Sequence, residues 1–83
     1  MTVLTANDLK KLHKNAPVRV AGIVTLRQQP KTANGVVFLS LEDETGTINI
    51  VCWNKIYKKF HKEILLSKVL LIDGLAQKEH GVI

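Results

Sequence analysis

The sequence predicts an all-β domain with one or two short helices, folded as a five-stranded barrel. Three runs rich in β-branched and aromatic residues follow one another, the later two alternate between apolar and polar positions, and a glycine interrupts the longest run. The 83 residues allow one domain with one modest core. We therefore expect a single domain over residues 1–83, with a helical lead-in over 1–16 and the barrel over 17–83.

The lead-in carries the signals of a short amphipathic helix. Thr5 or Asn7 can cap its N-terminus, because both side chains accept hydrogen bonds from backbone amides. Leu9 and Leu12 lie three residues apart and therefore share one face. Pro17 is expected to end the helix.

The first and longest strand is predicted over Val18–Arg27. Gly22 interrupts this run, and a glycine inside a strand usually marks a bulge or a sharp bend. Because a small barrel needs such a bend, we expect the sheet to curl back at Gly22.

Two further strands, Val36–Glu42 and Thr47–Trp53, flank the tight turn Asp43–Gly46. A hairpin turn pairs its strands antiparallel, so the two strands share their faces. Alternation assigns these residues to the core: Val37, Leu39, Leu41, Ile48, Ile50 and Cys52. The shared outer face is then expected to carry Phe38, Ser40, Asn49 and Val51.

Helical spacing begins after Asn54, which is a suitable N-cap. Ile56, Phe60 and Ile64 recur every four residues, which predicts an amphipathic helix. Its opposite face carries Lys55, Lys58, Lys59 and Lys62. We expect these lysines to form a solvated face at the other end of the barrel from the loops, although a second polyanion or partner contact stays open.

Strand character returns over Val69–Lys78, and Val82–Ile83 begins a strand that is truncated. The predicted order is three strands, a helix, a strand and a last strand. This is the order of the OB-fold, a five-stranded Greek-key barrel whose face and loops bind oligonucleotides. Its last strand lies between the third and the fourth, so truncation is expected to leave two open sheet edges.

Composition favours a soluble, cytoplasmic protein with a polyanionic partner. Twelve Lys and Arg against seven Asp and Glu give a net charge of +5, which favours nucleic acid but also suits a merely soluble surface. The single Cys52 is expected to be a buried reduced thiol. The apolar run Val69–Ile72 is far too short to cross a membrane, so no membrane partner is expected.

No catalytic or metal site is expected. Glu42, Asp43 and Glu44 are consecutive at the hairpin and point in alternating directions, so we interpret them as acids that shape the turn and not as ligands for two magnesium ions. The three histidines and one cysteine lack metal-ligand spacing. We expect no cofactor and no small-molecule substrate for this chain, and an independent enzyme is the least favoured hypothesis.

Short segments in a fixed order resemble the OB-type domain near the C-terminus of bacterial family C DNA polymerases, the polymerase III alpha subunits. These segments are Val18–Gly22, Arg27–Pro30, Thr32–Val36, Phe38–Gly46 and Val51–Trp53. The loop from Arg27 to Gly35 is most similar to that of the error-prone, damage-inducible form. The resemblance implies a noncatalytic fragment of a larger polymerase that binds the single-stranded DNA template during damage-induced repair synthesis. Its implied partners are the rest of the polymerase chain and possible replication or repair subunits.

Sites for single strands combine cations with aromatic faces on which bases stack. Phe38 is the best stacking candidate, and a Phe at the matching place stacks on a base in the related anticodon-binding barrels of aminoacyl-tRNA synthetases; packing under the neighbouring loop is the alternative. Arg27, Phe38 and Asn49 are expected to share one exposed wall. The full candidate set is Arg27, Gln28, Gln29, Lys31, Phe38, Ser40, Asn49, Lys78 and His80.

The other aromatic side chains have packing as their better interpretation. Trp53 is expected to cover the helix that follows it, while Tyr57 and Phe60 are expected to pack against the barrel end. The main alternative function is a protein-interaction domain that docks the polymerase to another subunit, for which outward Val51 and Trp53 would be suitable. A third hypothesis, an RNA-binding anticodon domain, shares the fold but lacks the adjoining residues expected there.

Overall fold

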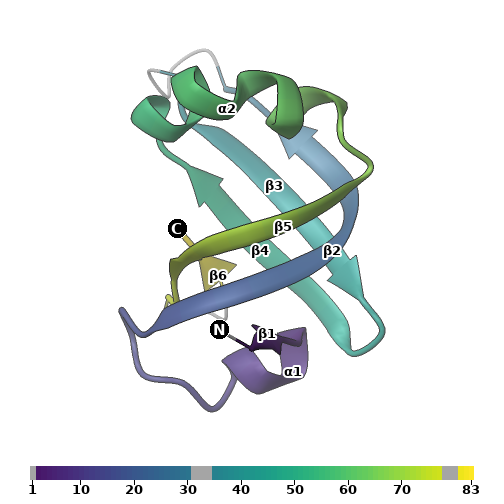
Figure 1. Cartoon of the computed structure of the whole chain (residues 1–83), viewed down its shortest axis with the longest axis vertical. Helices are drawn as coiled ribbons and strands as arrows, with labels where there is room; N and C mark the ends of the chain where they lie inside the picture. Colours follow the sequence, from purple (N-terminus) through teal and green to yellow (C-terminus); the bar gives the residue numbers. More distant parts are fainter. Residues whose placement is uncertain (1, 31–34, 78–80) are drawn as a thin grey trace.

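One curved sheet forms the framework of the domain. The computed structural model describes residues 2–30, 35–77 and 81–83, and these residues form six strands and two helices (Figure 1). The elements are β1 (Val3–Leu4), α1 (Ala6–Leu9), β2 (Pro17–Gln28), β3 (Val37–Asp43), β4 (Gly46–Cys52), α2 (Asn54–Leu66), β5 (Val69–Leu75) and β6 (Gly81–Val82). The sequence does not predict β1, a two-residue strand that pairs parallel with β2.

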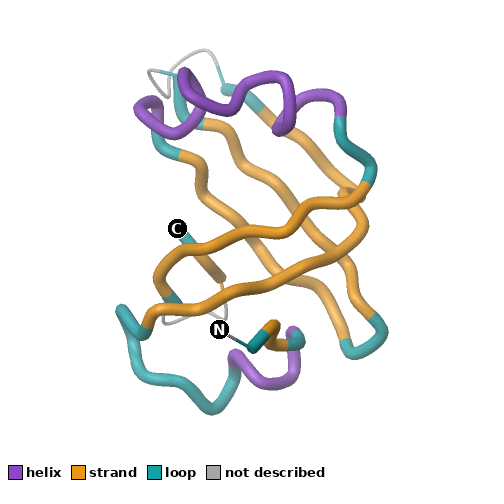
Figure 2. Tube along the Cα trace, in the orientation of Figure 1, coloured by secondary structure: helices purple, strands orange, loops and turns teal. Residues whose placement is uncertain are grey.

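The strand β2 joins the two halves of the sheet. Its first part, Pro17–Ile23, pairs antiparallel with β5, and its second part, Ile23–Gln28, pairs antiparallel with β3. The strands β3 and β4 form the predicted antiparallel hairpin. The β2–β5 ribbon crosses the β3–β4 hairpin, so the sheet folds over on itself around one core (Figure 2).

The short strand β6 lies between β4 and β5, as predicted for the last strand of an OB-fold. Gly81 and Val82 pair parallel with Asn49 and Ile50 of β4. On the other side the backbones of Leu75 and Ile83 exchange hydrogen bonds of 2.9 and 3.0 Å. Because β6 is so short, the described residues form an OB-type sheet that does not close as a barrel.

The predicted core residues of the hairpin are all buried. Val37, Leu39 and Leu41 of β3 and Ile48, Ile50 and Cys52 of β4 face inward. They pack with Val18 and Val20 of β2, Val82 of β6 and Ile64 of α2 in one cluster. Cys52 is a free cysteine, and burial raises the pKa of its thiol, which keeps it protonated and unreactive.

Gly22 allows a close approach between strands. A Cβ atom added there would lie 2.8 Å from the carbonyl oxygen of Glu42 and 3.0 Å from the Cβ of Leu41. No side chain fits at such distances, so glycine is required where β2 passes from β5 to β3. The expected bend at Gly22 thus lies next to Ile23, where the pairing of β2 changes from β5 to β3.

The bulge in β2 lies beyond Gly22. The register with β3 shifts between Val24 and Leu26, which leaves Thr25 as the extra residue. The Thr25 hydroxyl donates a hydrogen bond of 3.2 Å to the carbonyl oxygen of Ser40. One extra residue reverses the in-and-out alternation of everything that follows it in the strand.

The lead-in forms a shorter helix than predicted. Thr5 caps it through a capping box, in which its hydroxyl accepts from the Asp8 amide at 3.1 Å and the Asp8 carboxylate accepts from the Thr5 amide at 3.0 Å. The helix ends at Leu9, long before Pro17. Leu9 is buried but Leu12 is exposed, because residue 12 lies beyond the last helical turn.

The helix α2 also departs from the prediction. Its N-cap is Trp53 rather than Asn54, and no side chain caps it. The backbone is non-helical at Phe60 (φ −122°, ψ 27°). This kink breaks the expected apolar row, so Ile64 is buried while Ile56 and Phe60 stay exposed.

The Asp43 carboxylate ties the hairpin turn to α1. It accepts hydrogen bonds from the backbone amides of Ala6 at 2.7 Å, Thr45 at 2.8 Å and Gly46 at 3.1 Å, and from the Thr45 hydroxyl at 2.8 Å. Partial burial alone would raise its pKa, but these hydrogen bonds outweigh burial and hold the pKa below its usual range. The prediction that a hairpin acid shapes the turn is confirmed for Asp43.

We expect Asp43→Ala to lower the free energy of unfolding by about 2 kcal/mol, because a charged acceptor with several amide donors is removed. Glu44→Ala, one residue away and exposed, is the matched control and should change stability by less than about 0.5 kcal/mol. Denaturant unfolding of both variants measures the difference. Equal stability of the two variants would contradict the role given to Asp43.

The same carboxylate gives a pH dependence of known sign. Because its folded-state pKa is depressed, its stabilisation is complete above the unfolded pKa of about 4 and is lost as the pH falls through the lower folded value. The stability gap between the unaltered chain and Asp43→Asn should therefore shrink as the pH is lowered from about 6 to about 3. A gap that stays constant or widens on acidification would count against this.

The Arg27 guanidinium caps the C-terminal end of α2. Its Nε–H donates a 2.8 Å hydrogen bond to the carbonyl oxygen of Ile64, and Nη2 donates to the carbonyl oxygen of Ser67. Helix carbonyls in the last turn lack intrahelical partners, so a cation there satisfies them and opposes the negative end of the helix dipole. Arg27 therefore fastens α2 to β2.

Arg27→Ala should cost about 1 to 2 kcal/mol of unfolding free energy, since it leaves two carbonyl acceptors unpaired. The chain offers a matched control in Arg19, which forms an exposed ion pair with Asp73 at 2.6 Å. An exposed pair contributes about 0 to 1 kcal/mol, so Arg19→Ala should have the smaller effect on thermal unfolding. Equal destabilisation by Arg19→Ala and Arg27→Ala would show that the hydrogen bonds from Arg27 to α2 stabilise the domain no more than an exposed ion pair does.

Candidate nucleic-acid interface

The outer face of β2, β3 and β4 carries a shallow groove. Opposite residues of antiparallel strands point to the same side, and the register sets two rows across the three strands. One row is Leu26, Ser40 and Asn49, and the next is Gln28, Phe38 and Val51. These six residues, with Leu39 and Ile50 beneath them, line a hollow of about 230 Å³. We call this surface the groove.

Phe38 lies in the groove with polar side chains beside it. Its side chain is turned outward and is 39% exposed, so its ring is not part of the core. In the neighbouring row the Ser40 hydroxyl donates to the Asn49 side-chain oxygen at 3.5 Å. The arrangement offers an aromatic face next to hydroxyl and amide groups, which can stack on a base and hydrogen-bond its edges.

The structure brings together four of the predicted site residues: Gln28, Phe38, Ser40 and Asn49. Gln29 follows directly at the exposed end of β2. Lys31, Lys78 and His80 lie outside the described residues.

Arg27 does not share the expected wall with Phe38 and Asn49. Its register partner is Leu39, which faces the core, so the Arg27 side chain starts on the inner side of the sheet and reaches α2. The bulge at Thr25 is the reason, because without it the alternation would have turned Arg27 outward. The common wall of these three residues was a wrong prediction.

The same reversal brings Leu26 into the groove. Uninterrupted alternation would have placed Leu26 in the core with Val24, but it lies opposite Ser40 on the outer face and is exposed. No residue in the sequence marks Thr25 as the bulge, so this contribution could not be found from the pattern. Val51 was expected on this face, and it lines the groove opposite Phe38.

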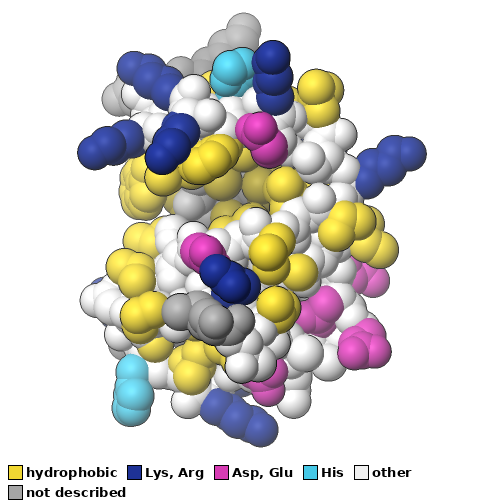
Figure 3. All heavy atoms as spheres, viewed as in Figure 1, with side chains coloured by type: hydrophobic (Ala, Val, Ile, Leu, Met, Phe, Trp, Pro, Cys, Tyr) yellow, Lys and Arg dark blue, Asp and Glu magenta, His cyan; other side chains and the backbone are white. Residues whose placement is uncertain are grey.

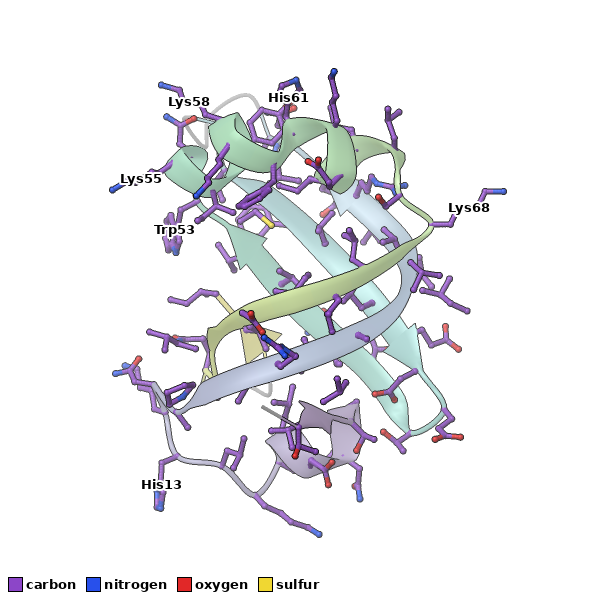
Figure 4. The ribbon with its side chains drawn as sticks, in the orientation of Figure 1. His13, Trp53, Lys55, Lys58, His61 and Lys68 are labelled. Carbon is purple, nitrogen blue, oxygen red and sulfur yellow. The ribbon has the colours of Figure 1, made fainter. Side chains whose placement is uncertain are left out.

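The aromatic residues near α2 divide between packing and exposure. Tyr57 packs against the core as predicted and contacts His61 with ring centroids 6.3 Å apart. Trp53 does not cover the helix: its side chain is 52% exposed, because it projects away from the end of β4 (Figure 4). Phe60 is exposed too, and the Lys59 ammonium lies 5.3 Å from the centroid of its ring.

The helix lysines lie at the same end of the molecule as Gly35, the described residue that ends the segment Gln28–Gly35. Gly35, which precedes β3, lies against Asn54 at the start of α2: an added Cβ would be 2.5 Å from the Asn54 side-chain oxygen. The expectation that these lysines lie at the other end of the barrel from the loops is therefore wrong for Gly35, while residues 31–34 lie outside the described residues. Lysine side chains gather over α2 at the top of the molecule (Figure 3).

Metal-ligating side chains do not cluster in the part of the chain that the structure describes. No three His, Cys, Asp or Glu side chains come together there in a group that could hold a metal ion. Neither of the two helices described is long and apolar enough to cross a membrane.

Comparison with known proteins gives one family and a consistent set of relatives. Residues 18–82 match the tRNA anticodon family, which is described as an OB-fold nucleic acid binding domain. Error-prone DNA polymerase 1 of Rhizobium meliloti (strain 1021) is 40% identical over 98% of this chain. The error-prone DNA polymerases of Rhodopirellula baltica and Brucella abortus biovar 1 are 44% and 49% identical over 94% and 80% of it.

The chain spans only 6% to 7% of the length of these curated relatives. Among solved structures, a chain of the S. pombe Stn1-ten1 complex superposes with a TM-score of 0.61 at 17% identity, covering 96% of this chain and 67% of that one. The likeness to the Stn1-ten1 chain concerns the fold alone. With the match over residues 18–82, this chain belongs to the family of OB-fold nucleic acid binding domains.

Proposed function

We propose that this domain binds single-stranded DNA in the groove, as a noncatalytic part of an error-prone bacterial DNA polymerase. The observation that carries the proposal is the outward Phe38 ring in a hollow lined by Gln28, Ser40 and Asn49. Every base has a π-face, so such a platform binds single strands with little sequence preference. In a duplex the π-face of each base is covered by the neighbouring bases, so it cannot stack on Phe38.

The polymerase context comes from the relatives. Because curated proteins at 40% to 49% identity are named error-prone DNA polymerases, we infer that the strand bound is the template during error-prone synthesis after DNA damage. The chain covers 7% of the length of such a polymerase, and we assign nucleotide transfer to the remainder of that length. We accordingly place the domain in the bacterial cytoplasm.

The charge of the domain supports a polyanionic partner. Its net charge is +5, and each phosphate of a single strand that a protein cation neutralises contributes about −0.7 to the slope of log affinity against log salt. Fluorescence anisotropy of a labelled oligo-dT at two salt concentrations should show micromolar or weaker binding that weakens with salt. Absence of binding at low salt would reject the proposal.

Phe38→Ala should weaken oligo-dT binding about 5- to 150-fold, which corresponds to about 1 to 3 kcal/mol for the stacking of one base. Leu71→Ala is the matched control, because Leu71 is also an outward apolar residue of the sheet but lies on β5. The affinity of the Leu71→Ala variant for oligo-dT should equal that of the unaltered chain. If both substitutions had the same effect, the groove would not be the binding surface.

A second candidate function is docking to another part of the polymerase chain. The outer face of the β2–β5 ribbon carries Ile23, Val69 and Leu71, which are 58%, 63% and 61% exposed. Ile23 pairs with Val69, and Leu71 lies two residues further along β5, so the three form one apolar surface. Single exposed apolar residues are ordinary, whereas a contiguous group of them indicates contact with a protein.

Leu71→Asp separates the two functions. It should abolish capture of the remaining polymerase chain, supplied as a separate protein, and leave oligo-dT binding unchanged. Phe38→Ala should give the reverse result. Capture that is insensitive to Leu71→Asp would exclude this surface as the docking site.

A further inference from the structure

We propose that the single strand continues from the groove onto the start of α2, where Trp53 stacks on a base and Lys55 and Lys58 contact phosphates. This inference rests on the proposed function and extends its site. It gives a role to an exposed indole that neither the fold nor the groove uses.

Trp53 continues the outer row of β4. Asn49 and Val51 point outward, and strand alternation gives the next outward position to residue 53. The backbone of Trp53 is still extended, with φ −66° and ψ 157°. Two residues of strand cover about 7 Å, so the indole follows Val51 directly, and Val51 is the register partner of Phe38.

Structural roles do not account for the indole. Trp53 is the N-cap residue of α2, yet its side chain makes no capping hydrogen bond. With 52% of its surface exposed, the ring also contributes little to the core. A large aromatic side chain held at the end of a groove, with about half of its surface open, is suited to contact a partner with a flat face.

Positive charge lies next to this ring. Lys55 and Lys58 are exposed on the first turns of α2, and the first turn contains no acidic residue. Both lysines project from the same end of the helix as Trp53 (Figure 4). In the described ranges neither lysine forms an ion pair within 4 Å, since the pair found there joins Arg19 and Asp73. Lys59 differs, because it lies over the Phe60 ring.

A nucleic acid strand satisfies this combination better than a protein segment does. Cations beside an aromatic ring match alternating phosphates and bases, which is the arrangement by which proteins hold single strands without reading their sequence. An apolar protein surface would leave both ammonium groups without a counter-charge. The groove ends where this surface begins, so one strand can pass over both.

The chain contains a single tryptophan, so its fluorescence reports on this surface alone. We expect oligo-dT to quench Trp53 emission with the same midpoint as the anisotropy of the labelled oligonucleotide. Trp53→Ala should weaken binding at least about 5-fold, as expected when one stacking platform is removed. Trp53→Phe should restore part of the affinity, because a smaller ring still stacks; circular dichroism establishes that each variant is folded.

The lysines are tested through salt dependence. The double variant Lys55→Ala with Lys58→Ala should reduce the slope of log affinity against log salt by about 1.4, that is, about 0.7 for each phosphate that is no longer neutralised. Lys10→Ala with Lys11→Ala removes the same charge next to α1, at the opposite end of the molecule (Figure 1). The slope of this control should remain that of the unaltered chain.

The outcomes distinguish the inference from the function on which it rests. Oligonucleotide binding with unquenched Trp53 emission, an unaffected Trp53→Ala variant or equal slopes for the two lysine pairs would overturn the inference and leave the groove in place. If the unaltered chain bound no oligonucleotide, both would fail. Quenching together with a slope change confined to Lys55 and Lys58 would establish the extended path.

Discussion

The composition of the groove depends on one extra residue in β2. Thr25 shifts the register with β3 by one position, which turns Leu26 outward beside Ser40 and sends Arg27 inward toward α2. A regular strand would have buried Leu26 and left the guanidinium of Arg27 in solvent. The bulge thus decides both which side chains a bound strand meets and how α2 is fastened to the sheet.

One charged side chain holds each end of the molecule. The end near α1 is held by Asp43, whose carboxylate gathers amides from the turn and from Ala6. The end near α2 is held by Arg27, which leaves the outward ring of Phe38 and the indole of Trp53 without structural duties. Neither Asp43 nor Arg27 lines the groove, so the side chains that hold the two ends leave the groove available for a partner.

Sequence alone predicts the hairpin well because alternation and a short turn together fix both its register and its faces. Phe38 was correctly turned outward for this reason. Arg27 and Leu26 were misplaced because the position of a bulge follows from the curvature of the whole sheet, which local pattern does not encode. Trp53 was misplaced because its position beside a helix does not reveal that its side chain projects away from the end of β4 (Figure 4).

The short strand β6 has a consequence for any extended segment that enters the seam between β4 and β5. Gly81 and Val82 already impose a direction, parallel to β4 and antiparallel to the end of β5. A segment that took the place of β6 in the reverse sense would therefore have to form an antiparallel ladder with β4 and a parallel ladder with the end of β5, with a different hydrogen-bond pattern on both sides.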